Sequence, residues 1–159
     1  MSPWFAVLGQ PVAHSRSPEI HAAFAQQFGR TLRYERIECA AGQLAAMLAA
    51  LAREGLIGAN ITLPLKAEAF ALCSARSPGG DAAQAVNTLA RIDRNVPISS
   101  PISGPGSRPI SWRGDNTDGA GLVRDLQLRH GISLAKTRIL ILGAGGAVQR
   151  QQWQRCERR

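Results

Sequence analysis

The sequence has few cysteines and no long apolar run, and both absences exclude classes of protein. Its 3 cysteines are odd in number, widely spaced and form no Cys-x-x-Cys pair, which argues against a disulfide framework and against a zinc site. No apolar run approaches the roughly 20 residues that a membrane-spanning helix needs. The start of the chain lacks the basic stretch of a signal peptide. We therefore expect isolated buried thiols at Cys39, Cys73 and Cys156, no metal, no membrane partner and a cytoplasmic location.

Acidic residues are also scarce: the chain has 11 Asp and Glu residues and 19 Lys and Arg residues, which gives a net charge of +8. A basic excess can attract nucleic acid. Here, however, arginine is concentrated in the last ten residues, and the remaining charge is scattered without interleaved aromatic side chains. We therefore expect no nucleic-acid partner. The 159 residues, 45% of them hydrophobic, are typical of a globular protein.

Short apolar runs alternate with amphipathic segments along the chain. This alternation predicts an α/β fold with an open, largely parallel sheet flanked by helices. We expect strands over residues 4–9, 33–39, 58–63, 85–92 and 137–143, and helices over residues 17–29, 43–54, 67–75 and 118–131.

The first predicted helix has clear signals at both ends. Ser17 before Pro18 is typical of an N-cap followed by a first turn, and Gly29 is a good terminator. Ile20, Phe24 and Phe28 fall at spacings of four residues and predict one apolar face.

Residues 94–112 interrupt the alternation. Prolines recur at every fourth position, between glycines and serines, so that no packed element is expected. We interpret the segment as a flexible Pro/Ser/Gly insertion at the surface rather than a docking motif.

Polar side chains gather where the predicted strands end, which is where open α/β sheets bind ligands. The set combines hydroxyls, amides, one ammonium and one carboxylate: Ser15, Ser17, Asn60, Thr62, Lys66, Asn87 and Asp118. Such a set suits a small, polyhydroxylated, acidic ligand. Each member alone also has a structural interpretation, since Ser17 can cap its helix and residues 115–119 can form a turn.

Five ordered motifs, "HSRSP", "GANITLPLK", "AVNTL", "GDNTDG" and "GAGGA", resemble those of shikimate dehydrogenase. That family reduces 3-dehydroshikimate to shikimate with NADPH in the biosynthesis of chorismate and the aromatic amino acids. It has an N-terminal substrate-binding domain and a C-terminal Rossmann domain. One departure is Gln84, which stands just before "AVNT" where the family commonly has glycine.

The resemblance implies a role for each matching residue. Ser15 and Ser17 would bind the substrate carboxylate. Thr62, Asn87 and Asp118 would hold the ring hydroxyls, Asn60 would support that wall, and Lys66 with Asp118 would form the catalytic pair. The cofactor NADP(H) would lie against the glycine turn formed by Gly143, Ala144, Gly145, Gly146 and Ala147.

The residues after Val148 do not continue the family pattern, because they provide neither an amphipathic helix nor a second strand. We expect a truncated form with impaired activity. The expected division is a substrate-binding domain over 1–118, a linker helix over 119–137, the start of a Rossmann domain over 138–148, as an incomplete βαβ unit, and an atypical tail over 149–159.

Alternative functions remain open at this point. The chain could be a non-catalytic shikimate-binding fragment, or another two-domain dehydrogenase acting on quinate and shikimate or on methylenetetrahydrofolate. It is also open whether the chain forms a homodimer.

Overall fold

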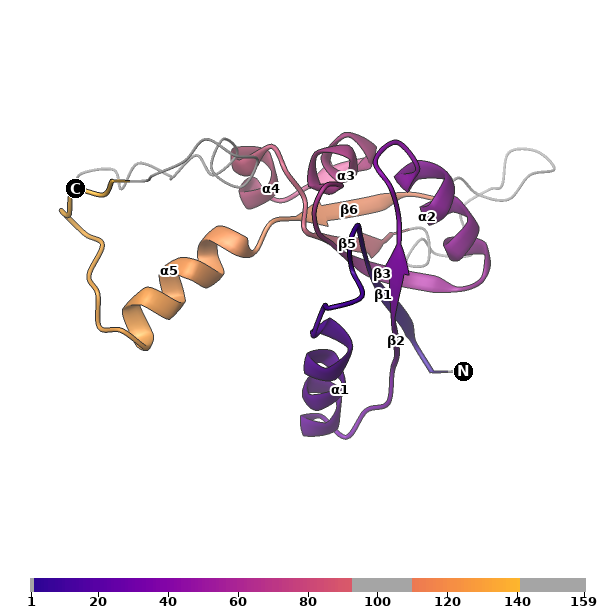
Figure 1. Ribbon diagram of the computed structural model, residues 1–159, viewed down its shortest axis with the longest axis horizontal. Helices are drawn as coiled ribbons and strands as arrows, with labels where there is room; N and C mark the ends of the chain where they lie inside the picture. Colours follow the sequence, from indigo (N-terminus) through magenta and orange to yellow (C-terminus); the bar gives the residue numbers. More distant parts are fainter. Residues whose placement is uncertain (1, 93–109, 141–159) are drawn as a thin grey trace, which may run out of the picture.

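The computed structural model describes residues 2–92 and 110–140 (Figure 1). In chain order the elements are β1 (Trp4–Gly9), α1 (Ser17–Gln27), β2 (Arg33–Glu38), α2 (Leu44–Arg53), β3 (Leu56–Ile61), α3 (Lys66–Leu72), β4 (Ala75–Arg76), α4 (Pro78–Ala83), β5 (Thr88–Arg91), β6 (Trp112–Asp115) and α5 (Asp118–Leu128). In the described part of the chain, every helix is too short or too polar to cross a membrane.

The described strands form one open sheet in the order β2-β1-β3-β5-β6-β4. β1 pairs in parallel with β2 and β3, and β4 pairs in parallel with β6, whereas β5 is antiparallel to both of its neighbours. The sheet is therefore mixed, and the predicted open α/β fold flanked by helices is confirmed. The reversal at β5 places the start of that strand at the same edge as the ends of β1 and β3.

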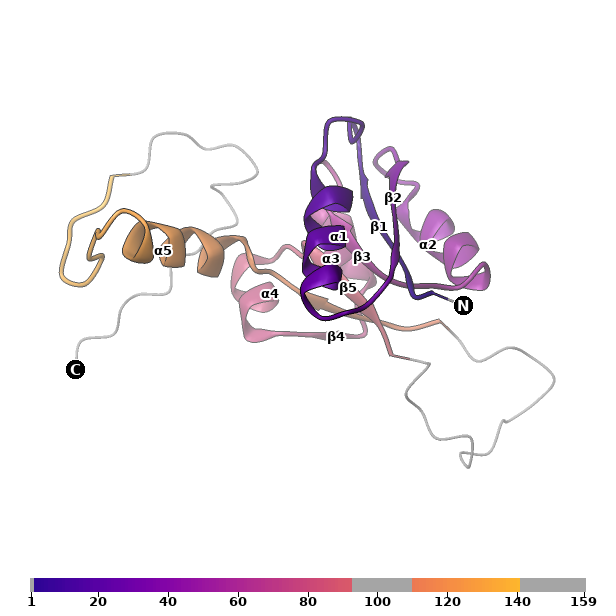
Figure 2. The ribbon, with the colours of Figure 1, turned by 90° about the horizontal axis from the view of Figure 1, so that it is seen from below.

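The helices cover both faces of the sheet, with α1 on one side and α2 and α3 on the other (Figure 1). β1 lies between β2 and β3, so the connection from β1 to β2 and the connection from β2 to β3 run in opposite directions across the sheet. Since both crossovers are right-handed, α1 and α2 lie on opposite faces. Leu44, Leu48 and Leu51 of α2 are buried against the sheet, in the helix predicted over residues 43–54. Helix α5 extends away from the sheet and has no buried residue (Figures 1 and 2).

The predicted isolated thiols are confirmed at two of the three cysteines. Cys39 and Cys73 are buried and free of disulfides, and burial raises the pKa of both thiols. Cys156 lies outside the described residues.

The predicted first helix is confirmed as α1, but its predicted N-cap is wrong. Arg16 is the N-cap and Ser17 is already helical, because the Ser17 hydroxyl is engaged by Ser15 rather than by the helix backbone. The expected apolar face lies in solvent, with Ile20 48%, Phe24 52% and Phe28 77% exposed. Among the residues of α1 only Ala25 is buried, so the helix packs on the sheet through a small side chain.

Three predicted strands also differ from the structure. β3 ends at Ile61, because the chain turns at Thr62 and leaves Leu63 60% exposed. β5 begins only at Thr88. Residues 137–140 of the last predicted strand are not in a strand, since no described strand pairs with them, and residues 141–143 lie outside the described residues.

α4, β4 and β6 were not predicted from the sequence. Most of the predicted insertion, residues 94–109, lies outside the described residues, but its expected end is wrong because Trp112 starts β6.

Gln84, the departure from the family pattern, ends α4 in the left-handed conformation, with φ 47° and ψ 34°. A side chain with a Cβ is strained there, whereas glycine adopts this conformation without penalty. The structure thus gives a physical reason for glycine at this position.

We expect Gln84→Gly to raise the free energy of unfolding by about 1 kcal/mol, because it removes the left-handed penalty. The matched control is Gln26→Gly, in the last turns of α1, which should lower the same free energy by up to about 1 kcal/mol. Urea unfolding monitored by circular dichroism measures both. A loss of stability in Gln84→Gly would contradict the conformational assignment.

Candidate active site

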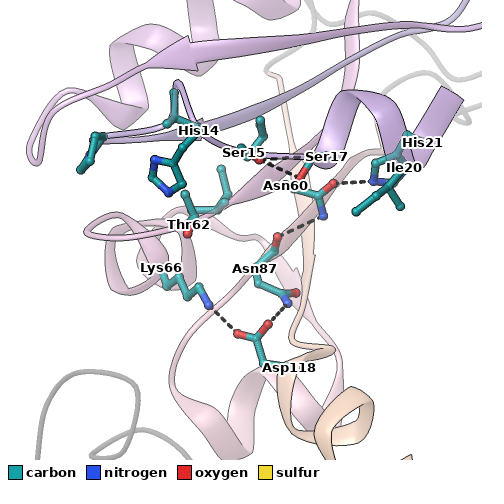
Figure 3. A pocket seen from close by; sticks show the side chains of 14 residues that line it. His14, Ser15, Ser17, Ile20, His21, Asn60, Thr62, Lys66, Asn87 and Asp118 are labelled. Atoms are coloured by element: carbon teal, nitrogen blue, oxygen red, sulfur yellow. Dashed lines mark hydrogen bonds and ion pairs between the residues drawn. The ribbon is translucent and has the colours of Figure 1, made fainter. Parts of the chain in front are cut away.

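The described residues form a cavity of about 360 Å³ at the edge where β1 and β3 end. All seven side chains that the sequence analysis selected line it, together with His14, Ile20 and His21 (Figure 3). They come from the turn after β1, the first turns of α1, the end of β3, the start of α3, the approach to β5 and the start of α5. Polar groups distant in sequence therefore converge on one pocket.

Lys66 and Asp118 form an ion pair in this pocket, with 2.5 Å between Nζ and Oδ2 (Figure 3). Each is the first residue of its helix, α3 and α5 respectively, so the helix starts aim both side chains at the pocket. The side chains keep 27% and 38% exposure, and a pair so accessible to water contributes little to folding stability. The same accessibility leaves both charged groups within reach of a ligand.

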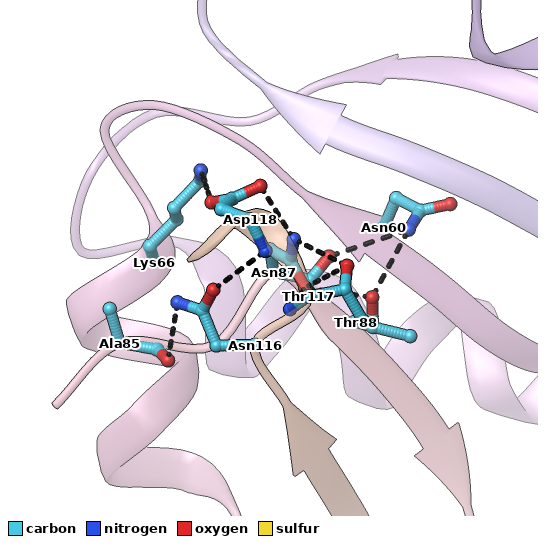
Figure 4. A network of polar contacts seen from close by, with 8 residues as sticks. All are labelled: Asn60, Lys66, Ala85, Asn87, Thr88, Asn116, Thr117 and Asp118. Carbon is cyan, nitrogen blue, oxygen red and sulfur yellow. Dashed lines mark hydrogen bonds and ion pairs between the residues drawn. The ribbon is translucent and has the colours of Figure 1, made fainter. Parts of the chain in front are cut away.

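Asn87 connects this pair to the sheet. It is 8% exposed, and its Nδ2 donates to Asp118 Oδ1 at 2.8 Å and to Thr117 Oγ1 at 3.0 Å (Figure 4). Its Oδ1 accepts from the Thr88 hydroxyl at 2.8 Å and from the Thr117 N–H at 3.2 Å. Asn87 thus uses both ends of its amide, and Asp118 is held between an amide and an ammonium.

The turn that carries Asp118 is itself fixed by side chains. Asn116 Nδ2 donates to the Ala85 carbonyl at 3.0 Å, and its Oδ1 accepts from the Asp118 N–H at 3.0 Å (Figure 4). Local hydrogen bonds of this kind are what Asn and Asp contribute to turns. The polar turn predicted from the sequence is therefore also the support of the candidate acid–base pair.

The two serines lie together on the opposite wall. The Ser15 hydroxyl donates to Ser17 Oγ at 3.0 Å and accepts from the Ser17 N–H at 3.3 Å. Arg36 Nε donates to the Ser15 carbonyl at 2.7 Å, and the same guanidinium pairs with Glu19 at 2.6 Å. The turn is thus anchored to β2, and its hydroxyls line the pocket.

Asn60 occupies the wall between the serines and Asn87. Its Oδ1 lies 2.6 Å from the Tyr34 hydroxyl, which donates to it, and 3.0 Å from His21 Nε2. Thr62, two residues further on, keeps its main chain bonded to β1 through the Leu8 carbonyl at 2.9 Å and lines the same wall.

Three residues of the site, His14, His21 and Tyr34, were not predicted from the sequence. His14 lies within the quoted "HSRSP" motif, and His21 lies one helical turn after Ser17, so spacing could have indicated both. Tyr34 is on β2, remote in sequence, and no local pattern connects it with Asn60.

Among residues 2–92 and 110–140, no group of three or more His, Cys, Asp or Glu side chains is arranged to hold a metal ion. The predicted cofactor turn, Gly143 to Ala147, lies outside the described residues.

The fold and the pocket define a class, the open α/β domains with an oxygen-rich, charged pocket at the strand ends, which is where such sheets bind ligands. Comparison with known proteins gives the particular family. Residues 7–89 match the family profile described as the shikimate dehydrogenase substrate binding domain. The chain belongs to the shikimate dehydrogenase family.

Known relatives agree with this assignment. The chain is 49% identical over 145 residues to shikimate dehydrogenase (NADP(+)) of Xanthomonas campestris pv. campestris, covering 91% of this chain and 46% of that one. It is similar to the shikimate 5-dehydrogenase of Thermus thermophilus solved with shikimate, with a TM-score of 0.73 and 36% identity over 91% of this chain and 49% of that one. The same Thermus enzyme has been solved with NADP(H) and shikimate, at the same TM-score and identity and covering 48% of that chain. The chain therefore spans about half the length of the relatives it matches.

Tyr34, the single tyrosine of the chain, gives a direct probe of this wall. Burial raises its pKa from the usual 10.0 to about 12. The folded state therefore binds the phenol proton more tightly than the unfolded state does. The stability that this tighter binding adds to the folded state is fully present below pH 10 and is lost as the pH rises towards 12.

We expect the phenolate absorbance to appear with a midpoint near pH 12 in the folded chain and near pH 10 in urea. Ultraviolet titration measures both, and Tyr34→Phe provides the blank. A midpoint near pH 10 before unfolding would contradict the buried environment.

Proposed function

We propose that this pocket binds shikimate and 3-dehydroshikimate, and that the chain provides the substrate-binding part of an NADP-dependent shikimate dehydrogenase. The observation that carries the proposal is the Lys66–Asp118 pair, held by Asn87 on one wall of a pocket whose other wall carries two serine hydroxyls. The Xanthomonas and Thermus relatives support the choice of substrate.

Each wall suits one part of that substrate. The hydroxyls of Ser15 and Ser17 can donate to a carboxylate, a charge-assisted bond stronger than one between neutral groups. Thr62, Asn87 and Asp118 offer donors and acceptors to ring hydroxyls, and Asn60 supports this wall.

Lys66 and Asp118 are proposed to move the proton. Bound NADP(H) would supply the hydride, and the oxygen on the reacting carbon must gain or lose a proton in the same reaction. In the reducing direction, Lys66 Nζ donates a hydrogen bond to the carbonyl oxygen and transfers its proton to it. In the oxidising direction the pair accepts that proton, and Asp118 stabilises the ammonium that forms.

The division of the chain remains part of the proposal. We assign substrate binding to residues 1–118, a linker to 119–137, of which α5 forms the helical part up to Leu128, and contacts to NADP(H) to the predicted turn at Gly143 to Ala147. We also propose a cytoplasmic location, in keeping with the isolated thiols, and a homodimer, which sedimentation would test.

The first test is binding without cofactor. We expect calorimetry to detect shikimate binding to the chain, and Ser15→Ala and Ser17→Ala each to weaken it about tenfold, because a hydrogen bond to a charged group is lost. Ser133→Ala, exposed and outside the pocket, is the control and should bind as the parent does. Shikimate methyl ester, which lacks the carboxylate charge, should bind weakly to all four proteins. Failure of the folded chain to bind millimolar shikimate would reject the proposed function.

The second test concerns Lys66. Because the chain spans under half of its Xanthomonas relative, turnover is measured after fusion to the remaining part of that protein. Lys66→Ala should lower kcat by about 100-fold or more with a small change in KM, since the proton is transferred only in the transition state. A raised KM with unchanged kcat would assign Lys66 to ground-state binding alone.

A further inference from the structure

Asn60 lies in the pocket wall with both ends of its amide close to other polar groups. On one side, Oδ1 is 2.6 Å from the Tyr34 hydroxyl and 3.0 Å from His21 Nε2. On the other side, Nδ2 is 3.5 Å from the Asn87 carbonyl and 3.4 Å from Thr88 Oγ1. Figure 3 shows the amide between His21 and Asn87. The oxygen side is tightly bonded, and the nitrogen side makes only long contacts.

The surroundings fix which end of the amide is which. The Asn87 backbone carbonyl can only accept, so the Asn60 atom that faces it must be the nitrogen. The oxygen then faces Tyr34 and His21, and both must donate to it. His21 therefore carries a proton on Nε2, an assignment that rests on the hydrogen-bond pattern.

The two donors are themselves held in place. The rings of His21, on α1, and Tyr34, on β2, stack with centroids 4.5 Å apart and an interplanar angle of 12°. Each ring thereby limits the rotation of the other. Burial raises the Tyr34 pKa to about 12, so the phenol remains a neutral donor at physiological pH.

We propose that Tyr34 and His21 are positioning residues that hold the Asn60 amide with its oxygen occupied and its N–H side presented to a ligand oxygen. This inference rests on the proposed function, and it adds a layer behind the pocket wall. The long contacts of Nδ2 are weak, so a substrate hydroxyl can replace them at little cost. A hydroxyl can accept such a bond, whereas a ligand group that only donates cannot, so the arrangement selects oxygen over an ammonium at this position.

Shikimate calorimetry with matched variants tests the role. We expect Tyr34→Phe to weaken binding about fivefold, because one hydrogen bond to the Asn60 oxygen is lost. His21→Gln, which retains an N–H donor, should bind within about twofold of the parent, whereas His21→Leu should weaken binding about fivefold. His130→Gln, exposed beyond α5, is the control for the Gln substitution and should have no effect.

The decisive comparison is a double-mutant cycle, since a merely structural role for Tyr34 would act independently of Asn60. In an Asn60→Ala background, Tyr34→Phe should cause no further loss of affinity. The same fivefold loss in both backgrounds would overturn the proposal.

A measurement without ligand separates this inference from the proposed function. Nitrogen-15 NMR of the free chain should show the Nε2–H tautomer of His21, with its signal identified by its loss in His21→Gln. The Asn60 side-chain amide signal should shift in Tyr34→Phe. Absence of shikimate binding would reject the proposed function. The positioning role would then be judged from the NMR result: an Nδ1–H tautomer of His21, or an Asn60 amide signal that does not shift in Tyr34→Phe, overturns it.

Discussion

The hydrogen bonds of Asn87 are the constraint on which the site depends. This side chain lies just before β5, is nearly inaccessible to water, and joins the start of α5 to the sheet through Asp118 and Thr117. Helix α5 has no buried residue of its own, so this contact and the Asn116 turn are what place Asp118 beside Lys66. A buried amide that is hydrogen-bonded at both its nitrogen and its oxygen is costly to disturb, which makes the position of the carboxylate well defined.

The antiparallel β5 is what allows the site to form. In an all-parallel sheet the residue before a strand would lie at the edge opposite to the end of β3. Because β5 is antiparallel to β3, Asn60 stands opposite Thr88, and Thr88 stands opposite Asp115 on β6. Residues from three segments of the chain thus meet at one edge, where the turns after β1 and β3 add the serines and Lys66.

Much of this arrangement could be predicted from the sequence, because the buried strand β1 and the amphipathic helix α2 have clear local patterns. The seven site residues could be found because they occur in ordered motifs. The remaining features depend on contacts between segments that are distant in sequence, which local patterns do not show. Phe24 and Phe28 have helical apolar spacing and yet lie in solvent, since α1 packs through Ala25. The four-residue strand β6 is too short and too polar to show periodicity, and only its pairing with β4 and β5 defines it. The bond from Tyr34 to Asn60 spans 26 residues, and no local pattern predicts such a contact.

The site therefore has two layers. One contains the groups proposed to touch substrate, and the other contains side chains that orient these groups, such as Asn116, His21 and Tyr34. The most direct test of the central claim is to map shikimate on the chain by nitrogen-15 amide chemical shifts. If shikimate binds in this pocket, the largest shifts are expected at Ser15, Ser17, Thr62, Lys66 and Asp118. Shifts confined to the second hollow beside α1, around Ala22 and Arg30, or no shifts at millimolar shikimate, would contradict it.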